Sequence, residues 1–171
     1  YATYFEGAQF VHFLLGPATV ALAVPLFRQT ETLKRALPVI AFGVLFGSLV
    51  ASASTVILAW ALGASPETLA SLAPKSVTTP VAMGIAENIG GVPALTAVCV
   101  IATGIVGATL GPMVMNMARL KDWRARGFAM GVASHGIGTA RAAGAFSGLA
   151  MGLNTLATAL TIPFLWHWIF G

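Results

Sequence analysis

Ser134-His-Gly-Ile-Gly-Thr-Ala-Arg141 and Lys75-Ser-Val-Thr-Thr-Pro80 are two polar, helix-breaking stretches in a chain that is otherwise strongly apolar. Irregular backbone survives at membrane depth only where protein or a water-filled cavity supplies its hydrogen bonds. Paired breaks in hydrophobic segments are typical of an internal polar site near the membrane midplane. These two stretches therefore predict a membrane protein with an internal site.

The composition supports a membrane protein. Of the 171 residues, 57% are hydrophobic and 8% are charged, and the mean hydropathy is +0.87. Soluble domains carry about 25% charged residues because they must cover their surface with them. Apolar runs extend over 37–62, 92–118 and 146–171, and prolines interrupt a fourth over 8–27. Because about 20 residues cross the hydrocarbon layer, we expect an all-α polytopic protein in which residues 1–171 form a single transmembrane domain.

Basic residues gather in two short loops, which sets the predicted orientation. Excess Lys and Arg marks the cytoplasmic side of a membrane, so both loops are expected inside. The basic residues form no stripe with interleaved aromatics, so no nucleic acid partner is expected. Cys99 is the only cysteine, which excludes an intrachain disulfide and a multi-cysteine metal site, and we expect no metal or cofactor. The loop residues are Arg28, Lys34, Arg35, Arg119, Lys121, Arg124 and Arg126.

The segment 63–91 must then begin and end outside. It is too short and too polar for two crossings, so it is predicted to form a re-entrant hairpin with the Thr-Thr-Pro corner at its tip. The glycine-rich segment 126–145 begins inside and would form a second hairpin from the opposite face. Pro38 and Thr79 are separated by as many residues as Pro93 and Ser134. Residues 37–92 and 93–145 are therefore candidate inverted repeat units.

The first break is predicted to begin a helix. A hydroxyl residue before Pro80 is typical of a helix N-cap, and a helix over 81–89 would end at Gly90-Gly91. The free N–H groups and positive dipole of such an N-terminus suit a carboxylate or phosphate. An ordinary proline kink is the alternative interpretation.

The second break places Ser134, His135 and Thr139 among glycines that allow close approach to a ligand. Arg141 is costly at membrane depth unless paired, and its guanidinium matches a carboxylate, although it could instead reach the cytoplasmic interface. His135 could be structural, a ligand donor or a proton carrier. We expect a small carboxylate to bind between the two breaks, at Ser76, Thr78, Thr79, Ser134, His135, Gly136, Gly138, Thr139 and Arg141.

Other polar and small residues have less specific interpretations. Asn116 and Asn154 fall within apolar runs, where they could line a substrate path or hydrogen-bond between helices. Small residues four apart let helices pack closely and would permit self-association, so a homo-oligomer is expected. No enzyme is expected, because nothing in the sequence orients Ser134 as a nucleophile and no His-Glu-x-x-His motif is present. The glycine pairs are Gly43/Gly47, Gly107/Gly111, Gly127/Gly131, Gly144/Gly148 and Gly148/Gly152.

Five stretches together resemble the LrgB/CidB family, and the similarity covers nearly the whole chain. They are Pro74-Lys-Ser-Val-Thr-Thr-Pro-Val-Ala-Met83, Ile89-Gly-Gly-Val-Pro-Ala-Leu-Thr-Ala97, Gly104-Ile-Val-Gly-Ala-Thr-Leu-Gly-Pro112, Ala125-Arg-Gly127 and Ala133-Ser-His-Gly-Ile-Gly-Thr-Ala-Arg-Ala142. Members were named as antiholin-like partners in murein hydrolase regulation, and the plant relative resembles the plastid glycolate/glycerate translocator. Some bacterial relatives are associated with pyruvate uptake.

The resemblance implies small 2-hydroxy or 2-oxo monocarboxylates as substrates, a class that includes lactate, and an LrgA/CidA-like membrane partner. It places the protein in a bacterial plasma membrane, with the plastid inner envelope as the alternative. Two departures from the family stand out. Members usually carry further hydrophobic helices before the position of Tyr1, so we expect this sequence to be part of a longer protein. They also usually have a short acidic stretch between the positions of Ala142 and Phe146, which could pair with Arg141, whereas here the sequence runs straight through. We hypothesise a monocarboxylate carrier that uses proton symport or anion exchange, with a holin-like regulator as the competing function.

Overall fold

The computed structural model describes residues 30–139 and 144–170, and every element within them is a helix. The predicted apolar run over 8–27 lies outside the described residues. The all-α prediction is confirmed for the described part of the chain. The helices are α3 (Thr30–Ala61), α4 (Pro66–Leu72), α5 (Thr79–Asn88), α6 (Pro93–Met117), α7 (Trp123–Thr139) and α8 (Gly144–Phe170).

Three of these helices are long and apolar enough to cross a membrane, over Leu37–Ala61, Pro93–Met117 and Phe146–Phe170. Their outer faces carry large apolar side chains that no described residue covers. Phe42 and Trp168, for example, are 72% and 78% exposed. Such faces suit lipid rather than water, since exposed apolar area of this extent is rare on soluble monomers. The predicted spans are thus confirmed by length and composition.

Local sequence explains where the two short helices begin. Ser65 caps α4, and its hydroxyl accepts a hydrogen bond from the backbone N–H of Thr68 at 3.3 Å. Thr78 is the N-cap of α5, with Pro80 in the first turn, where a missing N–H is harmless. Both starts have an early proline, as the sequence predicted for the Thr-Thr-Pro corner, but Thr78 forms no side-chain cap hydrogen bond.

Gly90 ends α5 in a left-handed conformation, with φ of +83°. This geometry lets the N–H of Gly91 donate to the carbonyl of Ala86 at 2.7 Å, which satisfies one of the carbonyls left free at the helix C-terminus. The predicted stop at Gly90-Gly91 is confirmed.

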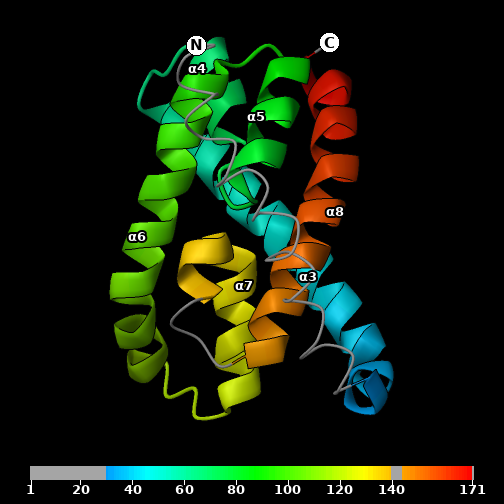
Figure 1. The fold of residues 1–171 in the computed structure, drawn as a ribbon. Helices are drawn as coiled ribbons and strands as arrows, with labels where there is room; N and C mark the ends of the chain where they lie inside the picture. The colour runs from blue at the N-terminus through cyan, green and yellow to red at the C-terminus, as the bar shows by residue number, and fades with distance from the viewer. Residues whose placement is uncertain (1–29, 140–143, 171) are drawn as a thin grey trace, which may run out of the picture.

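The short helices lie between the long ones. In Figure 1, α6 and α8 stand on either side, α5 occupies the upper half of the space between them, α7 occupies the lower half, and α3 crosses behind. Packing agrees with this view, because α7 contacts both α6 and α8 while α5 contacts α6 and α8. With 7 and 10 residues, α4 and α5 are too short to cross a bilayer alone.

Glycines on three helices allow the close packing of α7. A Cβ added at Gly47 of α3 would lie 2.8 Å from Val132, and one at Gly111 of α6 would lie 2.6 Å from Met130. A Cβ at Gly131 would lie 2.8 Å from the Cβ of Ala150 in α8.

The predicted close approach is therefore present at Gly43/Gly47 and Gly107/Gly111. The pair Gly148/Gly152 differs, because no described atom outside its own helix lies within 4 Å of a Cβ added at either position.

Candidate functional site

Asn154 of α8 joins the two breaks through its side-chain amide. Its Nδ2 donates to the carbonyl of Ser76 and to that of Val132, each at 3.1 Å. Pro80 has no N–H and cannot serve the Ser76 carbonyl as a helical partner, and Val132 lies just before the break in α7. An amide nitrogen carries two hydrogens, so one fully buried side chain satisfies both backbone groups.

The break in α7 falls at His135, whose φ of 43° and ψ of −144° are not helical. A positive φ in a residue other than glycine costs about 1–3 kcal/mol and persists only where the surroundings hold it. Here the ring Nε2 lies 2.7 Å from the carbonyl oxygen of Val100 in α6. Because a carbonyl only accepts, Nε2 must carry the proton in this bond, which leaves Nδ1 as the second titratable nitrogen.

Ser134 packs against α6 at a position where only glycine fits. A Cβ added at Gly107 would lie 2.5 Å from the Cβ of Ser134. Ser134 and Ser76 are both buried, 2% and 6% exposed. The two breaks therefore contribute hydroxyl groups to the interior of the bundle.

Lys75 is a residue of this region that the sequence analysis did not assign to the site. Its Nζ lies 3.4 Å from the hydroxyl of Ser76. The side chain is half-buried, and its charge is close enough to interact with both Cys99 and His135. The signal was present in the sequence, because a lone cation within an apolar region is a functional candidate by default.

Other predicted site residues are placed less centrally. Thr78 and Thr79 are half-buried at the start of α5, and neither hydroxyl hydrogen-bonds to another described residue. Gly136, Gly138 and Thr139 lie in the last turns of α7, and their surroundings are outside the described part of the structure. Arg141 lies outside the described residues altogether.

Asn116 lies apart from the polar cluster, which consists of Lys75, Ser76, Ser134, His135 and Asn154. It is exposed at the C-terminal end of α6, where its Oδ1 accepts a hydrogen bond from Arg126 Nη1 at 2.7 Å. The two asparagines that the sequence analysis paired thus have different positions, one at the helix end and one between the breaks. Asn154 also keeps a buried Oδ1 that no described residue satisfies, and the hydroxyl of Ser147 is in the same situation.

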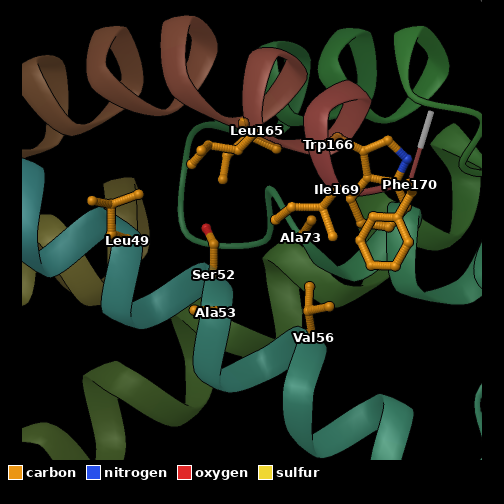
Figure 2. Close-up of a pocket in the computed structure, with 10 residues that line it drawn as sticks. Leu49, Ser52, Ala53, Val56, Ala73, Leu165, Trp166, Ile169 and Phe170 are labelled. Carbon is orange, nitrogen blue, oxygen red and sulfur yellow. The ribbon is translucent and has the colours of Figure 1, made fainter.

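An apolar groove lies between α3 and α8 (Figure 2). It encloses about 110 Å³, and Ser52 points its hydroxyl toward it from α3. The remaining lining is almost entirely hydrocarbon, which suits a lipid chain or a helix better than an anion. The lining residues are Leu49, Ser52, Ala53, Val56, Ala73, Ile162, Leu165, Trp166, Ile169 and Phe170.

Within residues 30–139 and 144–170, no group of three His, Cys, Asp or Glu side chains is placed to hold a metal ion. The polar cluster therefore consists of hydroxyls, amides, an imidazole and an ammonium. Such groups can bind an anion and exchange a proton.

An apolar α-helical bundle with three candidate spans and a polar cluster at two helix breaks defines an integral membrane protein. The chain belongs to the LrgB-like family, whose family model matches residues 1–168. It is 40% identical to YwbG of Bacillus subtilis, over 96% of this chain and 76% of that protein. It is 32% identical to the holin-like protein CidB of Staphylococcus epidermidis, over 96% and 75% of the two chains.

The holin-like protein CidB of Staphylococcus aureus (strain Mu50) is 31% identical over 96% of this chain and 75% of that protein. No solved structure matches the chain. The family resemblance noted from the sequence is confirmed. These relatives are bacterial, which indicates a bacterial membrane and gives no support to the plastid alternative.

Proposed function

We propose that this protein carries small organic monocarboxylates, of the glycolate, glycerate, pyruvate and lactate class, across a bacterial plasma membrane. The observation that carries the proposal is the meeting of two helix breaks in a buried polar cluster. Asn154 ties the carbonyls of Ser76 and Val132 together in the middle of an otherwise apolar bundle. A purely structural bundle has no need for paired breaks, whereas midplane binding sites are built from them.

The proposal includes two re-entrant hairpins that enter from opposite faces. The first consists of α4, the 73–78 turn and α5, and the second is built on α7 with its break at His135. Their placement in the upper and lower halves of the space between α6 and α8 supports opposite entry (Figure 1). Residues 37–92 and 93–145 are the corresponding inverted repeat units.

The substrate carboxylate would lie near the α5 N-terminus, where the helix dipole and the hydroxyls of Ser76, Thr78 and Thr79 favour an anion. From the second break, Ser134 would donate a hydrogen bond. His135 would carry a proton on Nδ1, since Nε2 already bonds Val100. Gly136, Gly138, Thr139 and Arg141 remain proposed members of this site. The cycle needs no covalent catalysis and no cofactor.

The test is uptake of labelled glycolate, glycerate, pyruvate and lactate by proteoliposomes that contain the full-length protein, with and without an inward proton gradient. Saturable uptake of any of the four is expected, and acceleration by the gradient would indicate symport. Equal rates in protein-containing and empty liposomes, with protein shown to be folded, would contradict the proposal.

A holin-like or antiholin-like regulator of murein hydrolase activity is the second candidate function. The observation in its favour is the similarity to two proteins named holin-like protein CidB. Such a function predicts self-association or a small LrgA/CidA-like membrane partner. Release of a trapped dye from liposomes, without saturable carboxylate uptake, would favour this second function over the first.

A further inference from the structure

Lys75 is a cation without an anionic partner among the described residues. It follows α4 directly, where its N–H donates to the carbonyl of Leu72 at 3.1 Å. Within the described part of the chain, its Nζ hydrogen-bonds to a neutral hydroxyl, that of Ser76 at 3.4 Å, which is long for a charge-assisted bond. A charged ammonium in an apolar region is stable only when a counter-charge or strong hydrogen bonds compensate for lost water.

The described acidic side chains do not supply that counter-charge. Glu67 and Glu87 are exposed on α4 and α5, and Asp122 is exposed beside α7, where it accepts a hydrogen bond from the backbone N–H of Arg124. None of the three forms an ion pair with Lys75. Among the described side chains, Lys75 therefore has no carboxylate to compensate its positive charge beside the first break.

The groups around Lys75 are neutral or weakly polar. Of the described titratable side chains, Cys99 of α6 and His135 of α7 are near enough to interact with its charge. The His135 ring already donates to the Val100 carbonyl, and the Asn154 amide already donates to both breaks. These donors are committed to backbone carbonyls, so among the described groups the ammonium is the strongest donor left for a ligand.

We propose that Lys75 is the specificity-determining residue of the site and that it binds the carboxylate of one singly charged anion. This inference rests on the proposed transport function. One fixed positive charge neutralises one carboxylate, so a neutral analogue loses the attraction and a dianion brings a second, unpaired charge into a low-dielectric site. An ammonium binds as a point charge and places few demands on the shape of the rest of the ligand.

The test uses proteoliposomes with the full-length protein and labelled glycolate. Unlabelled glycolate, its neutral amide glycolamide, and tartronate, the same carbon centre with a second carboxylate, serve as competitors. For the wild type, glycolate should compete at least about 10-fold better than either analogue. Lys75→Gln should raise the KM for glycolate by about 10- to 100-fold and bring the glycolamide and glycolate competition constants close together.

Two variants separate a binding role from a structural one. Lys75→Arg keeps the charge and should retain glycolate preference over glycolamide with a KM within about 10-fold of the wild type. Lys121→Gln removes an exposed lysine from the loop before α7 and should leave uptake unchanged. Thermal unfolding of each purified variant identifies any that fails to fold.

The outcomes also separate this inference from the proposed function. No wild-type uptake would overturn both. Wild-type uptake with an unchanged KM and unchanged competition pattern in Lys75→Gln would overturn the role of Lys75 alone. Equal loss of uptake in folded Lys75→Gln and Lys75→Arg would also overturn it, because a charge role requires that arginine preserve the preference for the anion.

Discussion

Replacement of Asn154 by alanine tests whether one side chain holds the two breaks together. Asn154 is fully buried, and its Nδ2 donates to the carbonyls of Ser76 and Val132 at 3.1 Å each. The variant removes both hydrogen bonds at once. It also leaves two carbonyls without this donor in a region where water is scarce.

The expected magnitude follows from these two bonds. A hydrogen bond between membrane helices contributes about 0.6 kcal/mol on average and up to about 1.7 kcal/mol. A buried acceptor left unsatisfied adds a penalty of about 1–3 kcal/mol in the least favourable case. We expect Asn154→Ala to lower the free energy of unfolding by about 2–4 kcal/mol, which corresponds to a fall in Tm of about 4–16 °C for a chain of this size.

The assay is thermal unfolding of the purified protein in one detergent, followed by intrinsic fluorescence. Asn116→Ala is the matched control, because Asn116 is exposed and its hydrogen bond joins the half-buried Arg126 at 2.7 Å. This control should lower the free energy of unfolding by less than about 1 kcal/mol. Equal Tm values for the two variants would refute the reasoning that Asn154 links the breaks.

The remaining predictions concern glycines, and all are checked by Tm in the same detergent. Gly131→Ala should lower the free energy of unfolding by about 1–3 kcal/mol, because the new Cβ would meet the Ser147 carbonyl and lie 2.8 Å from Ala150. Gly148→Ala, with open space around it, should be neutral or stabilising by up to about 1 kcal/mol. An equal fall in Tm for Gly131→Ala and Gly148→Ala would contradict the packing argument. Gly90→Ala should lower the free energy of unfolding by about 1 kcal/mol, because the φ of Gly90 is +83°. Gly84→Ala within α5 is the control and should not lower it. An unchanged Tm in Gly90→Ala would contradict the assigned helix stop.

The sequence was sufficient for features that depend on local pattern. The long apolar runs predict the spanning helices, since length and hydropathy alone decide whether a segment can cross a bilayer. The start of α5 near Pro80 and its end at Gly90 follow from residue types with restricted backbone conformations. Membership of the LrgB-like family was predicted from short sequence motifs around the two breaks and is confirmed by the family model.

Which residues form the candidate site was harder to predict from the sequence. Ser76, Ser134 and His135 follow from the sequence as candidate site residues, and all three are buried in the structure. Lys75 is a candidate from its charge alone, but a lysine beside a turn can also reach water, and the fold is needed to show that it is half-buried beside Ser76. The re-entrant path and the inverted repeat stay predictions, since no membrane boundary is defined by the helices themselves.

The class of fold, the ends of α5 and the positions of the two breaks therefore follow from the sequence, because each depends on residues close together in the chain. Three other features appear only once the helices are packed: Asn154 satisfies both breaks, the φ change falls at His135, and Gly107 leaves room for Ser134. These features join residues of different helices. Their energies depend on which helices lie next to each other, and local propensity contains no record of that arrangement.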